Sequence, residues 1–120
     1  MNKLLWLLAA AAVPARAADP IHGRDAFRVC SACHSGAPGA IGPNLEGILG
    51  RPAASLPSFR YSGPLKHKGI IWTPDNLQAF LVDPQSVVPG NRMPFSGTTS
   101  EIAADIVAYL TTLDAHRPEP

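Results

Sequence analysis

The chain has 120 residues, a length that suits one domain with a modest core. Hydrophobic residues make up 46% and charged residues 16%, a composition that excludes a disordered chain. The net charge is +1 and the ten basic residues are scattered, so no basic stripe is present to bind nucleic acid. Thirteen prolines and ten glycines predict short helices separated by ordered loops, with little regular sheet.

Residues 1–18 are predicted to form a secretory signal peptide. Lys3 precedes an apolar run over residues 4–13, which is too short to span a bilayer because about 20 residues are needed. Ala15-Arg16-Ala17 matches a signal cleavage site, so the mature chain would begin at Ala18 or Asp19. An uncleaved membrane anchor is the alternative. Cleavage implies export, to the periplasm if the source is a bacterium with two membranes.

Cleavage would also change the charge balance. It removes Lys3 and Arg16, two of the ten basic residues, and none of the nine acidic ones. The mature protein would therefore be close to neutral, at a net charge near −1. Electrostatic steering of a partner is then expected to be modest.

The first helix is expected to start at Asp19-Pro20, since proline is tolerated in the first turn, and to run to about Ser31. It leads into Cys30-Ser31-Ala32-Cys33-His34, the C-x-x-C-H pattern of covalent haem attachment. Two residues between the thiols span the gap between the two haem vinyl groups, and the following imidazole is placed to be the proximal iron ligand.

Three other interpretations of this pentapeptide remain open. A redox dithiol needs a βαβ context, which the flanking sequence does not show. A zinc site needs two further ligands, whereas Cys30 and Cys33 are the only cysteines and the other histidines, His22, His67 and His116, are widely separated. A short structural disulfide is conceivable in an exported protein. The three other histidines are expected to be solvated surface residues.

Residues 36–60 are rich in glycine, proline and serine and predict loops with at most one short helical turn. Thr73-Pro74-Asp75 then signals a helix start, and Leu77, Phe80 and Leu81 give an apolar face on a helix of about ten residues. Asp83-Pro84 is expected to begin another short helix that ends near Pro89.

Met93 is the only methionine outside the predicted signal peptide. It lies in Pro89-Gly90-Asn91-Arg92-Met93-Pro94-Phe95, a loop that could bring the thioether to the iron opposite His34. Core filling is the alternative role for a loop methionine. Histidine and methionine together raise the reduction potential, and a six-coordinate iron leaves no open position for a substrate.

The last helix has the clearest pattern. Thr98-Thr99-Ser100-Glu101 fits a capping box, and one apolar stripe follows it. The stripe consists of Ile102, Ile106, Tyr109, Leu110 and Leu113. Residues 115–120 are expected to be a frayed tail, which leaves residues 19–114 as the domain.

Residues 23–113 together resemble the small soluble class I cytochromes c of the mitochondrial and photosynthetic-bacterial type. The resemblance rests on C-x-x-C-H, on Gly42-Pro43-Asn44-Leu45, on Lys68-Gly69-Ile70-Ile71-Trp72 and on the methionine loop. It implies an all-α class I cytochrome c fold, in which short helices and ordered loops wrap around one haem c attached through two thioethers.

The resemblance also assigns roles to single residues. Gly23 and Phe27 would cross the last helix near Ile106 and Tyr109. The Pro43 carbonyl would accept a hydrogen bond from His34 Nδ1, which fixes the ring. Three side chains would contact the haem propionates, because a carboxylate at the haem edge must be paired; they are Arg51, Tyr61 and Trp72. An apolar shell would comprise Phe27, Leu45, Trp72, Phe80, Leu81, Phe95 and Ile106.

Several positions depart from the family pattern. Phe80 replaces a tyrosine that hydrogen-bonds the methionine sulfur, and Leu65 replaces an asparagine near a buried water network. Gln85 and Ser86 stand where many relatives carry docking lysines. We therefore expect a docking surface that lacks the basic ring of mitochondrial relatives.

The implied function is outer-sphere transfer of single electrons by a monomer that docks transiently through a haem edge near the cysteines. Its redox partners would be a membrane cytochrome complex, an oxidase or a periplasmic dehydrogenase, of which it could also be a dedicated subunit. A haem enzyme or gas sensor, in which Met93 leaves the iron, is the alternative from another functional class.

Overall fold

The computed structural model describes residues 16–114, so most of the predicted signal peptide and the predicted tail lie outside the described residues. Six helices follow in order: α1 (Pro20–Ala26), α2 (Arg28–Ser31), α3 (Gly63–His67), α4 (Pro74–Val82), α5 (Pro84–Val87) and α6 (Ser100–Asp114). Over residues 16–114 the extended backbone pairs only in one isolated bridge, between Pro52 and Ile71. The predicted all-α fold is confirmed, and none of these helices is long and apolar enough to cross a membrane.

The predicted first helix begins where expected but is divided in two. The Asp19 carboxylate caps α1 by accepting from the amides of Ile21 and His22, at 2.9 and 3.3 Å. Phe27 separates α1 from α2, yet its φ and ψ of −67° and −12° are close to helical values. The Ser31 amide still donates to the Phe27 carbonyl at 2.9 Å. The chain thus keeps its direction and carries the cysteines to the cavity described below.

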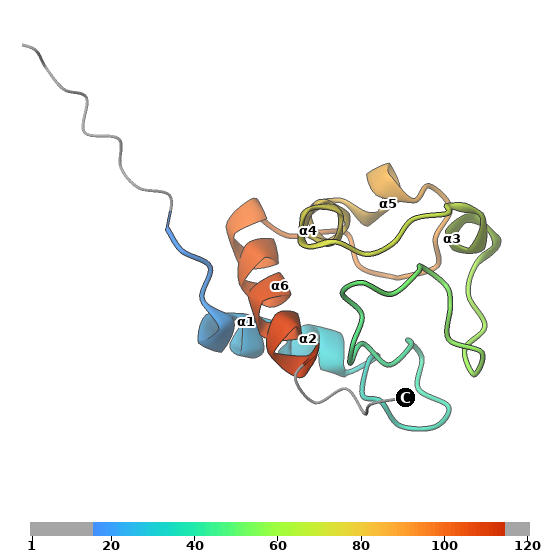
Figure 1. Cartoon of the computed structure of the whole chain (residues 1–120), viewed down its shortest axis with the longest axis horizontal. Coiled ribbons are helices and arrows are strands. Elements are labelled where there is room, and N and C mark those ends of the chain that lie inside the picture. Colours follow the sequence, from blue (N-terminus) through green and yellow to red (C-terminus); the bar gives the residue numbers. More distant parts are fainter. Residues whose placement is uncertain (1–15, 115–120) are drawn as a thin grey trace, which may run out of the picture.

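The crossing of α1 and α6 forms one end of the molecule (Figure 1). Gly23 is buried there, and a Cβ at this position would collide with the main-chain carbonyl of Asp105. The rings of Phe27 and Tyr109 lie beside this contact, with centroids 5.3 Å apart. The expected contact of Gly23 and Phe27 with α6 is therefore present, and it requires glycine because the two backbones are so close.

The other helix starts follow capping chemistry. At α4, Thr73 and Asn76 form a reciprocal capping box, and at α5 the Asp83 carboxylate accepts from the Ser86 amide at 3.2 Å. At α6, Thr99 Oγ1 accepts from the Ile102 amide at 3.2 Å. The capping box predicted from Thr98 to Glu101 is therefore wrong in detail, because Thr99 caps the helix, and Glu101 pairs with Arg16 at 2.7 Å.

Helix α3 was not predicted from the sequence. Its start has a recognisable signal, since Ser62 Oγ accepts from the Leu65 amide at 3.3 Å and proline stands in the first turn. Without an apolar stripe, this five-residue helix has no periodic signature. The loop prediction for residues 36–60 is confirmed, because the structure has no helix between α2 and α3.

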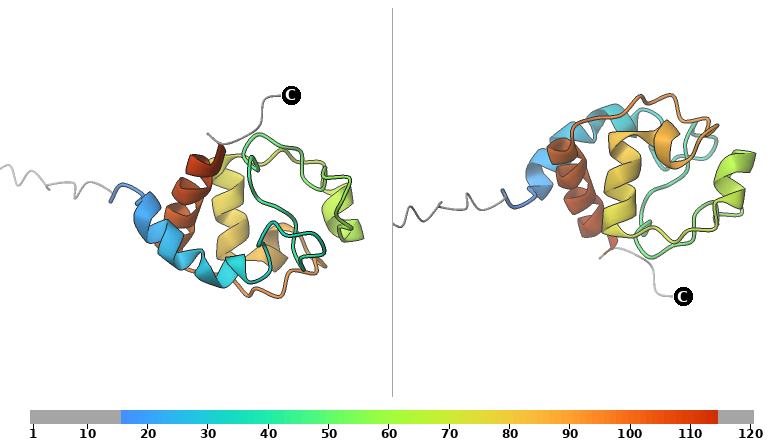
Figure 2. Two further views of the ribbon diagram at one scale, coloured as in Figure 1. Left: turned by 90° about the horizontal axis from the view of Figure 1, so that it is seen from below. Right: turned by 90° about the horizontal axis from the view of Figure 1, so that it is seen from above.

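Figure 2 shows how helices and loops divide the molecule. Helices α1, α2, α4 and α6 lie together, and α3 lies at the opposite end beyond the long loop over residues 32–62. The loop is tied back beside the isolated bridge, where the Gly50 amide donates to the Trp72 carbonyl at 2.8 Å and the Trp72 amide to the Arg51 carbonyl at 3.0 Å. These bonds place Arg51 next to Trp72, on the wall of one cavity.

Candidate haem site

Helices and loops enclose a cavity of about 660 Å³, a volume typical of small-molecule and cofactor sites. Its wall is mainly apolar, and every member of the predicted apolar shell contributes to it. These residues are Phe27, Leu45, Trp72, Phe80, Leu81, Phe95 and Ile106. Phe80 and Leu65, two of the departures from the family pattern, also line the cavity. The same cavity is lined by all eight predicted site residues.

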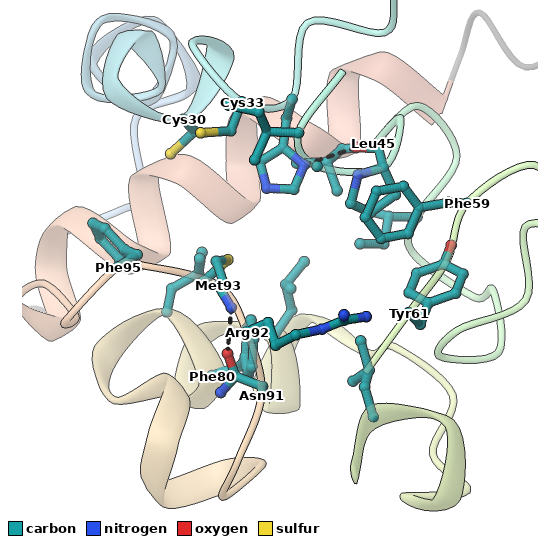
Figure 3. Close-up of a pocket in the computed structure, with 18 of the residues that line it drawn as sticks. Cys30, Cys33, Leu45, Phe59, Tyr61, Phe80, Asn91, Arg92, Met93 and Phe95 are labelled. Atoms are coloured by element: carbon teal, nitrogen blue, oxygen red, sulfur yellow. Dashed lines mark hydrogen bonds between the residues drawn. The ribbon is translucent and has the colours of Figure 1, made fainter. Parts of the chain in front are cut away.

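Cys30 and Cys33 enter the cavity from the end of α2 (Figure 3). Both are half-buried free thiols, so they do not form the disulfide considered above. Burial raises the pKa of the Cys30 thiol, and the nearby Cys33 raises it further. No group of three or more histidine, cysteine or acidic side chains among residues 16–114 is arranged to hold a metal ion, which leaves the zinc interpretation without support.

His34 is held on the same side of the cavity by the loop that follows it. Its Nδ1 lies 2.7 Å from the Pro43 carbonyl oxygen, the contact expected from the sequence. Since a carbonyl can only accept, Nδ1 carries the proton and Nε2 keeps its lone pair. A Cβ on Gly42 would lie 2.6 Å from His34 Cε1, so only glycine lets the loop pass this close to the ring.

Met93 reaches the cavity from the opposite side (Figure 3). Its half-buried side chain comes from the loop that follows α5. The Met93 amide donates to Asn91 Oδ1 at 2.9 Å, and the preceding helix thereby determines where the residue lies. A thiol pair with an imidazole on one side and a thioether on the other therefore converge on a single apolar space.

The three residues predicted to contact the haem propionates all line the cavity. Trp72 and Tyr61 are buried, and the Tyr61 hydroxyl accepts from the Leu56 amide at 3.3 Å, which leaves its own proton to donate. Arg51 donates to the carbonyls of Glu46 and Asn44, at 3.0 and 2.9 Å. These bonds show that it holds the loop, while its contact with a propionate remains a prediction.

Two further arginines on the cavity wall were missed from the sequence. They are Arg60 and Arg92, and Arg92 Nη2 donates to the Arg60 carbonyl at 3.1 Å. Arg92 stood in the methionine loop that the sequence already indicated, next to Met93, so its position was a usable signal. Arg60 precedes Tyr61 but belongs to no motif that would separate it from surface arginines.

The donor set fits a planar, largely apolar cofactor with carboxylate substituents. Two thiols can form thioethers, and the imidazole and thioether can bind iron from its two faces. The arginine guanidinium groups and the Tyr61 hydroxyl are the donors that a partly buried carboxylate requires. The residues present therefore fit haem c, whereas a redox dithiol would use neither Met93 nor this cavity.

A second polar cluster lies outside the cavity, at the helix crossing. Asp105 is only 1% exposed, and it accepts from the Asp19 amide at 2.8 Å. Arg16 and His22 each lie 2.7 Å from its Oδ2 atom. The Asp19 amide, the His22 ring and Arg16 hold the pKa of Asp105 below its usual value, against the opposing effect of burial. His22 is half exposed as predicted, but its partner was not foreseen.

The chain is similar to known proteins over most of its length. The chain is 38% identical over 122 residues to cytochrome c2 of Blastochloris viridis, covering 96% of each chain. It is 42% identical over 103 residues to cytochrome c-550 of Ancylobacter novellus, covering 80% of this chain and 96% of the relative. Cytochrome cH from Methylobacterium extorquens has the same fold, with a TM-score of 0.74 at 36% identity over 78% of this chain and 98% of the other.

No protein-family model matches the sequence. Similarity at these levels over most of the chain nevertheless shows the family, and the relatives are electron carriers and not enzymes. The alternative of a haem enzyme or gas sensor is thereby set aside. The chain belongs to the class I cytochromes c, carries one covalently attached haem c and transfers electrons between redox partners.

Proposed function

We propose that Cys30 and Cys33 attach the haem, that His34 and Met93 are its two axial ligands, and that the protein shuttles single electrons with this iron. The observation that carries the proposal is that both thiols, the His34 ring and Met93 line one cavity, with the thiols and Met93 on opposite sides of it (Figure 3). When bound, the haem supplies an iron that cycles between two oxidation states, and this ligand pair raises its reduction potential.

The chain's own residues keep the site ready for electron transfer. The Pro43 carbonyl accepts from His34 Nδ1 and so fixes the ring, which leaves Nε2 as the atom to bind iron, and Gly42 packs against that ring. Buried apolar side chains such as Trp72 and Phe80, whose ring centroids lie 5.2 Å apart, exclude water. A rigid wall of this kind changes little between oxidation states, which favours rapid electron exchange.

We also assign the propionate contacts to Arg51, Tyr61 and Trp72. Their support is that all three line the cavity and that two of them are buried. Arg60 and Arg92 line the same cavity and would add positive charge to it. Substituting Arg51 with lysine would keep the charge but lose the bonds to two carbonyls, and a changed reduction potential in this variant would support the assignment.

The ligand assignment is tested by spectroscopy of the haem-loaded protein. The oxidised form should show the weak absorption band of a sulfur–iron bond, and Met93→Ala should abolish it. Met93→Ala should also bind carbon monoxide rapidly in the reduced form, because one axial position is then open. A band that survives in Met93→Ala would overturn the assignment of Met93.

Docking is proposed to use the edge of the cavity next to the cysteines. Val29 and Ile41 are 70% and 73% exposed there, beside Cys30 and close to Cys33, whose carbonyl accepts from the Gly42 amide at 2.9 Å. We define Val29, Cys30, Cys33 and Ile41 as the cysteine edge. Its exposed apolar side chains fit a small, transient interface that depends little on charge.

The proposed partners are a membrane cytochrome complex, an oxidase or a periplasmic dehydrogenase, met by an exported monomer after removal of residues 1–18. Electron exchange with each candidate, measured at increasing salt, should slow by roughly tenfold or less, because the chain is close to neutral and the cysteine edge is apolar. Val29→Ser with Ile41→Ser should slow this electron exchange more than salt does.

Mass spectrometry of the secreted protein tests cleavage before Ala18 or Asp19.

A further inference from the structure

Asn91 is a buried polar residue at the centre of the loop that carries Met93. It is 8% exposed, and its side-chain amide makes three hydrogen bonds. Nδ2 donates to the carbonyls of Pro84 and Val88, at 3.1 and 2.9 Å, and Oδ1 accepts from the Met93 amide at 2.9 Å. Figure 3 shows this last bond joining Asn91 to Met93 at the cavity wall. A buried amide bonded on both its nitrogen and its oxygen fixes the backbone on either side of it.

The exposed Gln85 side chain also forms hydrogen bonds with this loop. Its Nε2 donates to the Asn91 carbonyl at 2.9 Å, and its Oε1 accepts from the Gly90 amide at 3.0 Å. Gln85 belongs to α5, a helix of four residues, which is too short to be stable by itself. We call the side chains of Asn91 and Gln85 the amide clamp. Their hydrogen bonds connect α5 with Gly90, Asn91 and Met93, but not with Arg92.

The clamp supplies bonds that regular structure does not. The segment after Gly90 has no helix or strand until α6, so its backbone groups need other partners. Gly90 turns the chain with a φ of +84°, and Pro94 restricts the conformation of Met93 from the other side. Between these two fixed points, the Met93 amide depends on Asn91 for its position.

We propose that Asn91 and Gln85 are positioning residues that hold the Met93 thioether toward the iron. This inference rests on the proposed role of Met93 as the second axial ligand. The clamp touches Met93 only through its amide, so it acts on the direction of the side chain and not on the sulfur itself. Without the clamp the loop opens locally, Met93 leaves the iron part of the time, and the rest of the domain stays folded.

The test compares Asn91→Ala and Gln85→Ala with Ser86→Ala in the haem-loaded protein. Ser86 is exposed on the same short helix, so it controls for substitution in α5. Gln85→Glu adds an isosteric variant that keeps an acceptor for the Gly90 amide but loses the donor to the Asn91 carbonyl. Hydrogen exchange at the Met93 amide is measured against the Leu110 amide of α6, which reports on the core.

In Asn91→Ala the Met93 amide should exchange roughly tenfold faster or more, since the substitution removes its acceptor and two further buried hydrogen bonds. The Leu110 amide should exchange at the wild-type rate. The sulfur–iron band should weaken, and carbon monoxide should bind the reduced protein roughly tenfold faster. Gln85→Ala and Gln85→Glu should show smaller changes in the same direction, and Ser86→Ala should match the wild type.

Two outcomes would overturn the clamp. One is an Asn91→Ala protein whose Met93 exchange and carbon monoxide binding equal those of Ser86→Ala. The other is an equal rise in exchange at Met93 and Leu110, which would mean that Asn91 stabilises the whole fold and positions nothing. Met93→Ala tests the proposed function separately. If the sulfur–iron band persists in Met93→Ala, Met93 is not the ligand and the proposed function fails. If only the clamp fails, Met93→Ala still lacks the band.

Discussion

The helix crossing and the haem cavity solve the problem of a small core in opposite ways. At the crossing, α1 and α6 meet through Gly23 and through the rings of Phe27 and Tyr109, and every contact comes from the protein itself. At the cavity, the loop over residues 32–62 and the methionine loop surround about 660 Å³ that protein atoms do not fill. The crossing is packed by protein atoms alone, whereas the cavity requires its cofactor to complete the packing.

The largest expected effect follows from leaving the cavity without haem. Cys30→Ala with Cys33→Ala should prevent attachment, and the apolar side chains that line about 660 Å³ would then lose the group they pack against. A domain is typically stabilised by only about 5–15 kcal/mol, so this loss of packing should leave the loop half unfolded. Circular dichroism should show a large loss of structure, with any residual helix coming from the α1–α6 pair. A native-like spectrum would show that the loops close without the cofactor.

One added methyl group at Gly23 should destabilise the crossing. Gly23→Ala places a Cβ against the Asp105 carbonyl, and because main chain lies on both sides, neither group can move away cheaply. We expect a loss of about 3 kcal/mol in the free energy of unfolding of the haem-loaded protein. Gly63→Ala is the matched control, since a Cβ there has no neighbour within 4 Å, and its effect should stay within about 1 kcal/mol.

Asp105 should stabilise the crossing in a pH-dependent way. Its pKa is lowered in the folded state, so its contribution is complete above the unfolded value near 3.8 and is lost as the pH falls through the folded pKa. Asp105→Asn should therefore cost about 2 kcal/mol at neutral pH, where a buried charged hydrogen-bond acceptor is removed. Denaturant unfolding at neutral and acidic pH measures this difference, which should shrink in acid.

Asp25→Asn is the control for Asp105→Asn. Asp25 lies on α1 and pairs with Arg28 at 3.6 Å, with more than half of its side chain exposed. Such a surface pair contributes about 0.5 kcal/mol or less, so the variant should unfold almost as the wild type does. Both variants are compared in the chain that starts at Ala18, which keeps the Asp19 amide and His22 as partners of Asp105. A cost of Asp105→Asn that is equal at both pH values would contradict the assigned pKa shift.

The two regions also differ in what the sequence predicted. Short-range patterns predicted Cys30, Cys33 and His34 as site residues, and the structure places all three at one cavity. Capping residues such as Asp19 and Thr73 marked helix starts correctly. These signals succeed because the physics they report acts within four residues.

The residues that were missed act over longer distances. Asp105 has the sequence pattern of a surface acid beside the apolar stripe of α6, since its partners stand more than 80 residues earlier. Asn91 follows a Pro-Gly turn and resembles any loop asparagine until α5 is placed beside it. Helix α3 carries no periodic signal, and the split at Phe27 depends on local backbone angles that no residue type specifies. These features depend on tertiary contacts, which local sequence patterns do not report.

The smallest expected effect concerns the aromatic pair at the point where the crossing meets the cavity. Phe27 belongs to both, because it lines the cavity and its ring contacts Tyr109. Phe27→Leu and Tyr109→Leu should each lower the free energy of unfolding by about 1 kcal/mol, and a double-mutant cycle should give a coupling of roughly 0.5–1.5 kcal/mol. Coupling of this size would show that the two rings stabilise each other at the point where the crossing meets the cavity wall. Simple additivity would mean that the two rings contribute only buried area.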